Sequence, residues 1–419
     1  MDKFQITGGT PLQGELPVSG SKNAALPALA ACLLTAEPVT LRRIPPVKDI
    51  ATMQKLLAYT GAQIDQQDGS VRIEARSLDR PEAPYDVVKT MRASSLVLGP
   101  LVARTGVARV SMPGGCAIGA RPINMHISAL ELLGAEIEQS HGYVEARAPQ
   151  GLRGGRVHFD RITVTGTEDV LMAAVLARGE TIIGNAAREP EVTDLADLLI
   201  AMGAKIEGAG SSTIRVQGVE RLHGAEHTII PDRIEAGTFM LAAAITEGDV
   251  VISNCNPEHV SALTVKMQQA GAEVADAGPG ALRVRAHGRP TAIDVTTEEY
   301  PGFATDLQAQ YMAWMTIAQG ISFVTETIFE NRFMHTQELA RMGANIRIVG
   351  RQAIVAGEPE LTGAQVIASD LRASASLVLA ALRARGQSTI DRVYHMDRGY
   401  ERIEEKLAAA GARITRLTD

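Results

Sequence analysis

The chain has few cysteines and no long apolar run. Its three cysteines, Cys32, Cys116 and Cys255, form no C-x-x-C pair, which excludes a disulfide framework and is typical of a reducing compartment. No apolar stretch reaches the roughly 18 residues that a membrane-spanning helix needs. The opening residues, MDKFQITGG, have no apolar signal-peptide core. We therefore expect a cytoplasmic protein that does not insert into a membrane.

A strong charge of one sign is also missing. The net charge is −7 and charged residues make up 21% of the chain, so no general basic field would attract nucleic acid. An anionic ligand would therefore have to be held by local cations. The hydrophobic content of 45% is ordinary for a globular protein, and 419 residues are enough for two or three domains.

A short phrase recurs six times along the chain. Its copies are TGAQI, LGAEI, MGAKI, AGAEV, MGANI and AGARI, with glycines at Gly61, Gly134, Gly203, Gly271, Gly343 and Gly411. Successive glycines are 68 to 73 residues apart, and this regularity indicates a structural repeat. Each phrase ends an apolar run of helical spacing and precedes an alternating strand pattern, so its glycine suits a left-handed helix cap.

A second mark, G-x-x-x-L-x-G, begins at Gly8, Gly218 and Gly357. Only eight residues follow Gly411, too few for the strands that follow this phrase elsewhere. We therefore expect segment 1–20 to complete the sixth unit. Each unit then has the form βαβαββ.

Six units of this size favour two globular halves, because a single packed core stops growing near about 250–300 residues. We expect one three-repeat domain over 21–230, which carries the loop with Cys116. The other would combine 1–20 with 231–419 and carry Asp306, Asp370, Arg372 and Arg398. Two chain crossings would join the halves, which favours a hinge and a cleft between them.

Six cations stand where the sequence predicts the start of a helix. They are Lys22, Arg92, Arg121, Arg332, Arg372 and Arg398. A cation at an exposed helix N-terminus opposes the helix dipole at a cost of about 0.3–1 kcal/mol. Salt bridges between units are one explanation. We favour convergence on an anionic ligand, because helix N-termini offer free N–H groups to anions and arginine adds bidentate geometry.

Two residues could carry chemistry. Cys116 lies in the glycine-rich stretch PGGCAIGARP, where the nearby Arg121 would lower the pKa of the thiol. Asp306, in GFATDLQAQ, stands at a helix start where other units carry a cation. It is either an N-cap or a general base, and its departure from the repeat favours the base. No HExxH motif or cysteine cluster is present, so we expect no metal site.

Eight motifs, in order along the whole chain, resemble bacterial UDP-N-acetylglucosamine 1-carboxyvinyltransferases of the EPSP synthase family. They are GSKNAALP, KTMRAS, PGGCAIGARP, NAAREPE, PDRIEAGTF, FENRFMH, SDLRASASLVLA and HMDRGYERIEEKL. The resemblance implies an inside-out α/β barrel of two three-fold domains. It also implies transfer of enolpyruvyl from phosphoenolpyruvate to the 3-hydroxyl of the sugar, by addition and elimination, without a cofactor. This reaction would begin peptidoglycan synthesis.

The resemblance further implies roles for individual residues. Phosphoenolpyruvate would be held by Lys22, Asn23, Arg121 and Arg398. The nucleotide sugar would be bound by Asn23, Arg92, Arg121, Pro122, Ile123, Asn124, His126, Arg161, Thr163, Val164, Asp306 and Ile328. Cys116 would protonate the methylene carbon and be alkylated by fosfomycin, and Asp306 would take the hydroxyl proton, with Lys22 and Arg398 completing the catalytic set. Arg332, Asp370 and Arg372 would support the closed cleft, with Arg332 pairing across the domains.

Two alternatives remain open. A 3-phosphoshikimate 1-carboxyvinyltransferase would share the fold and phosphoenolpyruvate, but its lysine motif differs from GSKNAALP and it lacks the cysteine loop. A non-catalytic sensor of sugar nucleotides would use the same scaffold. The joint presence of Lys22, Cys116 and Asp306 argues against a sensor.

Overall fold

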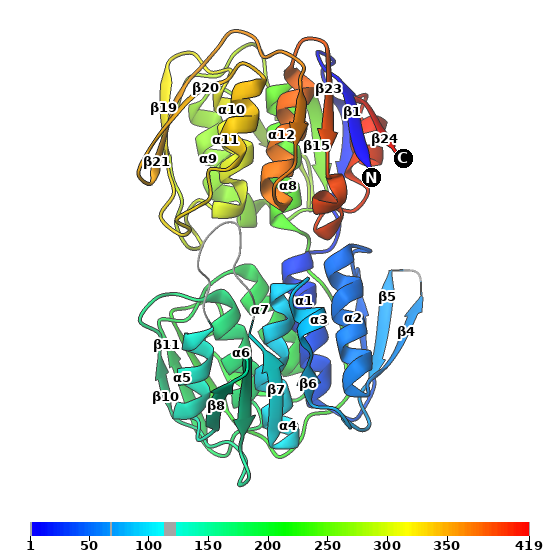
Figure 1. The fold of residues 1–419 in the computed structure, drawn as a ribbon, viewed down its shortest axis with the longest axis vertical. Helices are drawn as coiled ribbons and strands as arrows, with labels where there is room; N and C mark the ends of the chain where they lie inside the picture. Colours follow the sequence, from blue (N-terminus) through cyan, green and yellow to red (C-terminus); the bar gives the residue numbers. More distant parts are fainter. Residues whose placement is uncertain (1, 68, 113–122, 419) are drawn as a thin grey trace. The chain divides into compact units, whose positions relative to one another are not determined.

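The computed structural model of the chain describes residues 2–67, 69–112 and 123–418. These residues form two compact units (Figure 1). The 231–419 unit contains the described residues of 1–19 and 231–419, and the 20–230 unit contains those of 20–230. Within the described ranges, no helix is both long and apolar enough to span a bilayer.

The described strands form six four-stranded sheets, three in each unit. In the 20–230 unit, the strands of the first sheet lie in the order β14 (Glu226–Thr228), β3 (Val39–Arg42), β5 (Ser70–Glu74), β4 (Gln63–Gln67). Those of the second lie in the order β6 (Glu82–Ala83), β7 (Val107–Ser111), β9 (Tyr143–Arg147), β8 (Glu136–Ser140). Those of the third lie in the order β10 (Arg156–His158), β11 (Glu180–Gly184), β13 (Thr213–Gln217), β12 (Lys205–Glu207). In the 231–419 unit the strand orders of the three sheets are β2 (Gln13–Pro17), β15 (Asp249–Ser253), β17 (Leu282–Arg285), β16 (Glu273–Asp276); β18 (Val295–Thr296), β19 (Ile321–Thr325), β21 (Gln352–Ala356), β20 (Asn345–Val349); and β22 (Gln365–Ile367), β23 (Gln387–Asp391), β1 (Lys3–Thr7), β24 (Arg413–Leu417).

All six sheets share one pairing pattern. An edge strand runs parallel to the second strand, and the third strand runs antiparallel to both the second and the fourth. In five sheets the third and fourth strands are a hairpin. In the sixth they are β1 and β24, from opposite ends of the chain, with Ile6 opposite Ile414. The expectation that the N-terminus completes the sixth unit is confirmed for β1.

The rest of the N-terminal segment differs from this expectation. Strand β2 does not join the sheet of the sixth repeat. It runs parallel to β15, with Val250 opposite Gly14. Strand β14 likewise pairs with β3, far earlier in the chain. Each of these edge strands directly precedes the point where the chain enters the other unit, at Gly20 and Pro231. The two crossings therefore exchange the edge strands of the first and fourth repeats.

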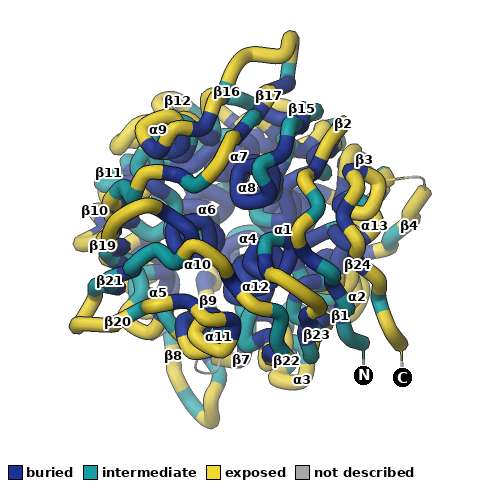
Figure 2. Tube along the Cα trace, turned by 90° about the horizontal axis from the view of Figure 1, so that it is seen from above, coloured by how far each residue is buried: buried dark blue, intermediate teal, exposed yellow. Residues whose placement is uncertain are grey.

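Each unit has three central helices, one from each repeat. They are α1 (Lys22–Ala31), α4 (Leu98–Thr105) and α6 (Val164–Ala174) in one unit, and α8 (Arg233–Ile245), α10 (Gln308–Met315) and α12 (Leu371–Arg383) in the other. The 3₁₀ helices η2 (Arg92–Val97) and η4 (Thr305–Leu307) precede α4 and α10. The three helices of each unit pack together, directly or through these 3₁₀ turns. In Figure 2 the central helices α6 and α8 are mostly dark blue, whereas β8, β20 and α9 carry much yellow.

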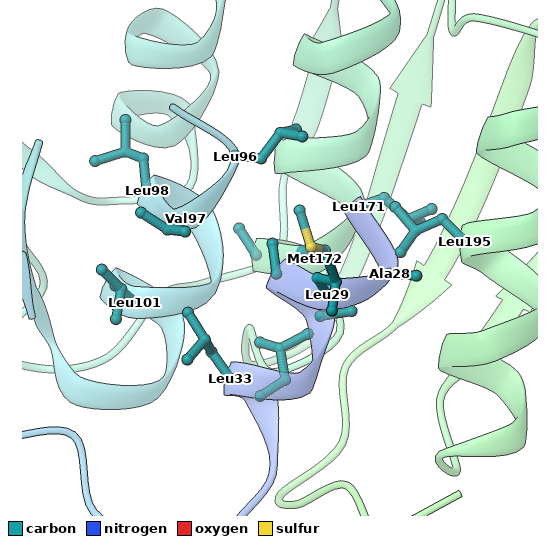
Figure 3. Packing of buried hydrophobic residues seen from close by; sticks show 14 of the residues in the cluster. Ala28, Leu29, Leu33, Leu96, Val97, Leu98, Leu101, Leu171, Met172 and Leu195 are labelled. Carbon is teal, nitrogen blue, oxygen red and sulfur yellow. The ribbon is translucent and has the colours of Figure 1, made fainter. Parts of the chain in front are cut away.

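The remaining helices complete the six repeats. They are α2 (Lys48–Thr60), α3 (Tyr85–Val88), α5 (Asn124–Leu132), α7 (Pro190–Ala201), α9 (Ser261–Gln269), α11 (His335–Arg341) and α13 (Ile403–Ala409), with η1 (Cys32–Leu34), η3 (Pro257–Val260) and η5 (Val393–Arg398). Figure 3 shows Leu29 and Leu33 beside Leu101 of α4 and Met172 of α6. Helices thus form the core and sheets surround it, which confirms the inside-out α/β architecture.

The repeated glycines have two structural causes. The glycines of the six-fold phrase all have positive φ, from +89° to +115°, where they end the second helix of each repeat. The first glycine of G-x-x-x-L-x-G instead passes close to a helix end. A Cβ at Gly8, Gly218 or Gly357 would lie 2.1, 1.6 or 1.9 Å from the carbonyl oxygen of Ala384, Ala177 or Ala318, just beyond α12, α6 and α10 respectively.

Candidate active site

Asp306 lies in η4, immediately before α10, and two arginines hold its carboxylate. Arg332 Nη2 lies 2.7 Å from Oδ1. Arg372 Nε and Nη2 lie 3.1 and 2.9 Å from Oδ2. The N-cap of η4 is Ala304 and that of α10 is Leu307, so Asp306 lies inside η4 and caps neither helix. The N-cap alternative is therefore excluded for Asp306.

The start of α12 positions Arg372. Asp370 is the N-cap, and its Oδ1 accepts hydrogen bonds from the backbone N–H groups of Arg372 and Ala373 at 2.9 and 3.0 Å. The guanidinium lies 5.4 Å from the ring centroid of Tyr400 and is almost fully buried. Asp370 thus offsets the unfavourable position of a cation in the first turn of a helix.

The charge environment makes Asp306 a weak base. Burial raises the pKa of Asp306, but the adjacent Arg372 and Arg332 outweigh burial and hold the pKa well below its ordinary value. Opposite charges at hydrogen-bond distance favour the ionised carboxylate. Asp306 is therefore ionised at neutral pH, and its affinity for a proton would rise only if an arginine contact were lost.

Two other predicted residues of this unit lie in unexpected places. Arg398 is the last residue of η5, and α13 begins only at Ile403. Its expected position at a helix start is wrong, because Arg402, with φ of 39°, breaks the helical path before α13. Arg332 lies in the turn before α11, and its guanidinium donates to Thr305 and Asp306, which belong to its own unit rather than to the other one.

In the 20–230 unit, Lys22 is the first residue of α1. Ser21 caps the helix by accepting a hydrogen bond from the N–H of Ala24 at 3.3 Å. Lys22 Nζ lies 3.2 Å from Oδ2 of Asp49, in the first turn of α2, and both side chains are largely buried. Asn23 is half-buried beside Lys22. Sequence reasoning missed Asp49, whose position in the first turn of a helix suggests only a favourable dipole interaction.

His126 connects the starts of two helices in the same unit. His126, in α5, is buried with Nε2 3.1 Å from Oγ1 of Thr165 in α6. Burial and the nearby charge of Arg92 lower the pKa of His126 to about 4. The imidazole is therefore neutral at pH 7 and can exchange one hydrogen bond with a polar ligand.

Five other residues predicted for the nucleotide sugar lie near these helix starts, whereas Ile328 follows β19 in the 231–419 unit. Thr163 caps α6 and accepts a hydrogen bond from the N–H of Gly166 at 3.2 Å. Val164 begins α6, and Arg161 is exposed just before it. Ile123 and Asn124 stand at the start of α5, with the Ile123 side chain buried.

Sequence reasoning also missed a buried carboxyl group in α6. Glu168 is 2% exposed. Burial raises its pKa well above the ordinary value, and the nearby Glu191, Glu189 and Asp169 raise it further. Burial and the neighbouring carboxyl groups thus favour the neutral form of Glu168.

The predicted loop residues Cys116, Arg121 and Pro122 lie outside the described ranges. The other two thiols can be compared with the expectation for Cys116. Cys32 and Cys255 are both buried, and burial raises the pKa of each thiol. Neither has the exposure or the low pKa of a reactive cysteine.

Sequence comparison relates the whole chain to known enzymes. Residues 6–407 match the family described as EPSP synthase (3-phosphoshikimate 1-carboxyvinyltransferase). A UDP-N-acetylglucosamine 1-carboxyvinyltransferase of Solibacter usitatus (strain Ellin6076) is 70% identical over 417 residues, with 100% of both chains covered. A protein of the same name from Koribacter versatilis (strain Ellin345) is 62% identical over 421 residues, covering 100% of this chain and 97% of that one.

Solved structures give a consistent result. The enolpyruvyl transferase NikO from Streptomyces tendae is similar with a TM-score of 0.89 and 25% identity, covering 100% of this chain and 99% of the other. An EPSP synthase from Acinetobacter baumannii is similar with a TM-score of 0.77 and 20% identity over all of both chains. The second likeness supports the fold alone.

Proposed function

Because the chain belongs to the EPSP synthase family, we propose that it transfers the enolpyruvyl group of phosphoenolpyruvate to UDP-N-acetylglucosamine and releases phosphate. The observation that carries this proposal is the 70% identity, over the full length of both chains, to a relative named for that activity. The reaction would commit the sugar nucleotide to peptidoglycan synthesis. We expect it to occur in the cytoplasm, which the scarcity of cysteine supports.

The reaction has two steps. In the addition step, the 3-hydroxyl oxygen of the sugar bonds to C2 of phosphoenolpyruvate, the hydroxyl proton passes to a base, and the methylene carbon C3 receives a proton. In the elimination step, C3 loses a proton, the C2–O bond to phosphate breaks, and the vinyl ether forms. One group that gives a proton to C3 and one group that takes the proton of the 3-hydroxyl are therefore needed.

We assign the base to Asp306 and the acid to Cys116. The ionised state of Asp306 supports the first assignment, since a base must be deprotonated before it acts. The approach of the sugar would weaken one arginine contact and raise the basicity of the carboxylate when it is needed. The burial of Cys32 and Cys255 supports the second assignment, because it removes the two rival thiols.

Cations would hold the two charged groups of phosphoenolpyruvate. We assign this role to Lys22, Arg121 and Arg398, with Asn23 as a hydrogen-bonding neighbour. The neutral His126 and the α6 start at Thr163 and Val164 support a site for uncharged and phosphate groups of the nucleotide, because helix N-termini bind anions. Arg92, Arg121, Pro122, Ile123, Asn124, Arg161, Asp306 and Ile328 would complete that site. Asp370 and Arg372 would support Asp306.

A mixed-substrate assay tests the proposed function. Phosphate release should require phosphoenolpyruvate together with UDP-N-acetylglucosamine and should be negligible with either alone. Equal turnover with shikimate 3-phosphate would reassign the enzyme to the other branch of its family. Tight binding of the nucleotide sugar without any phosphate release would support the sensor alternative.

Alkylation tests the assignment of Cys116. The phosphonate epoxide fosfomycin should add one mass increment to the native protein, on the peptide that contains Cys116. Peptides with Cys32 or Cys255 should react with a general thiol reagent only after unfolding, because both are buried. The Cys116→Ser variant should not be labelled, and the Cys116→Asp variant should keep part of the activity because a carboxylic acid also donates protons. Labelling of Cys32 or Cys255 in the native protein would contradict the assignment.

A further inference from the structure

Glu326 is a buried carboxyl group that the proposed reaction does not use. It follows β19 and is 1% exposed. Its Oε1 accepts hydrogen bonds from the Thr297 hydroxyl at 2.9 Å and from the N–H groups of Ile328 and Phe329 at 2.8 and 3.1 Å. Its Oε2 accepts one from the Thr305 hydroxyl at 2.8 Å. Four donors on one buried carboxylate fix the three segments that supply them, at Thr297, Thr305 and Ile328–Phe329.

Thr305 connects this carboxylate to the Asp306 site. Its single hydroxyl hydrogen is donated to Glu326, so a lone pair faces Arg332, whose Nη1 donates to Thr305 Oγ1 at 2.8 Å. The other terminal nitrogen of Arg332 holds Asp306 Oδ1 at 2.7 Å. The planar guanidinium therefore bridges two consecutive residues. If the Thr305 hydroxyl turns, Arg332 loses one of these two contacts.

The Ile328–Phe329 segment, which Glu326 holds, also contacts Arg332. The Arg332 guanidinium carbon lies 5.1 Å from the centroid of the Phe329 ring, in the range of a cation–π contact. The backbone N–H groups of Phe329 and of its neighbour Ile328 both point to Glu326 Oε1. The guanidinium of Arg332 is thus placed by a hydroxyl and by an aromatic ring, and Glu326 orders both.

We propose that Glu326 is a positioning residue for the transfer reaction, which sets the orientation of Asp306 through Thr305 and Arg332. The proposal rests on the assignment of Asp306 as the base. Glu326 itself does not touch the carboxylate that would take the proton. Its effect is to hold Arg332 on Oδ1, the Asp306 oxygen that has a single donor among the described residues, while Arg372 holds Oδ2.

Two substitutions interrupt the connection at different points. Thr305→Val keeps the shape of the side chain and removes the hydroxyl. Glu326→Gln keeps an oxygen for the N–H groups of Ile328 and Phe329 but places an NH₂ group against Thr305. The Thr305 hydroxyl then accepts from this amide and loses the acceptor that kept its hydrogen away from Arg332. Thr305→Ser restores the hydroxyl. Thr325→Val is the matched control, because its hydroxyl accepts a hydrogen bond from Gln352 and none from this network.

Steady-state kinetics with phosphoenolpyruvate and UDP-N-acetylglucosamine give the first readout. We expect kcat to fall about tenfold or more in Thr305→Val and Glu326→Gln, since a base displaced by about 1 Å can cost up to roughly 10²-fold. The KM for phosphoenolpyruvate should stay within about twofold, because neither Thr305 nor Glu326 is among the residues assigned to hold it. Thr305→Ser should recover most of the lost kcat, and Thr325→Val should match the parent. Active-site concentration is measured with fosfomycin, so that lost folded protein is not counted as lost kcat.

Crystal structures of the parent and of Thr305→Val give a second readout that does not need activity. The distance from Arg332 Nη2 to Asp306 Oδ1 should exceed 3.5 Å in the variant. An unchanged distance, a Thr305→Val kcat within twofold of the parent, or a Thr305→Ser enzyme as slow as Thr305→Val would each overturn the proposal. If the parent enzyme does not use these substrates, the proposed function fails, and the crystallographic distance still decides the role of Glu326 in positioning.

Discussion

Arg372 holds one oxygen of Asp306 with two nitrogens, Nε at 3.1 Å and Nη2 at 2.9 Å. Arg332 holds the other oxygen. The side chains of the two arginines are 5% and 8% exposed, so both cations depend on this carboxylate for compensation. The carboxylate assigned as the base is therefore also an important electrostatic element of its own unit.

Asp306→Asn should destabilise the protein as well as inactivate it. Removing the charge leaves two buried guanidinium groups without their common partner, which costs about 3–5 kcal/mol for a buried pair. Urea unfolding of the parent and the variant at pH 7 measures the difference. Asp86→Asn is the control, because Asp86 is an exposed partner of Lys89 and should matter little.

The pH dependence of that difference has a definite sign. The pKa of Asp306 is depressed in the folded state, so its stabilisation is complete above the unfolded pKa of about 3.9 and is lost as the pH falls through the folded value. The difference between parent and Asp306→Asn should therefore be constant from about pH 8 to pH 5. A difference that already shrinks between pH 7 and pH 5 would contradict the low pKa.

Lys22 should have separable structural and functional roles. Lys22→Met removes the cation 3.2 Å from the buried Asp49, and we expect a loss of about 3 kcal/mol in the free energy of unfolding. It should also raise the KM for phosphoenolpyruvate at least about a hundredfold, since a contact to a charged ligand group is lost. Adding Asp49→Asn to Lys22→Met should restore most of the stability and none of the substrate binding. Recovery of binding in the double variant would remove Lys22 from the substrate site.

The repeat could be predicted because it depends on local backbone requirements. A glycine with positive φ is needed wherever the second helix of a repeat ends, so glycine recurs at the same place in the sequence of every repeat. The pairing of β2 with β15 could not be predicted in this way. Strand β2 satisfies the local pattern of an edge strand in either sheet, and only the tertiary crossing at Gly20 decides which sheet it joins.

The site was predicted where a residue type departs from the repeat, as at Asp306. Its partners were not fully predicted, because a buried acid is satisfied by residues distant in the sequence. Glu326 and Thr305 are 21 residues apart, and no spacing rule connects a strand end to a 3₁₀ turn. The predicted position of Arg398 at a helix start was wrong, because the run DRGYERIEEKL has the pattern of a single helix. The structure breaks this run at Arg402, which has a positive φ although it is not glycine.

Glu235 should make stability fall as pH rises. It is in the first turn of α8 and is 2% exposed, with Oε2 2.6 Å from the N–H of Ser19 and Oε1 2.8 Å from Nζ of Lys406. Burial raises the pKa of Glu235 to about 7, although Lys406 opposes this. The folded state therefore keeps a proton that the unfolded chain releases near pH 4.3, and stability is lost as the pH rises through about 7. Relative to the parent, the free energy of unfolding of Glu235→Gln should rise by ~1–3 kcal/mol between pH 5 and pH 8, as measured by urea unfolding. A constant difference over that interval would show that Lys406 keeps the carboxylate ionised throughout.

The backbone at Gly218 lies so close to the end of α6 that we expect this position to tolerate no side chain. A Cβ there would lie 1.6 Å from the carbonyl oxygen of Ala177, which is backbone and cannot move aside without displacing the end of α6. We expect Gly218→Ala to destabilise the protein by about 3 kcal/mol or more, as overpacking against backbone does.

Gly134→Ala is the matched control, since Gly134 has a positive φ of 89° but no described atom within 4 Å of the point that its Cβ would occupy. It should cost only the strain of the left-handed backbone, about 1–2 kcal/mol. Thermal unfolding of both variants compares the two causes directly. A loss in Gly218→Ala no larger than that in Gly134→Ala would show that the close approach to Ala177 does not exclude a side chain at Gly218.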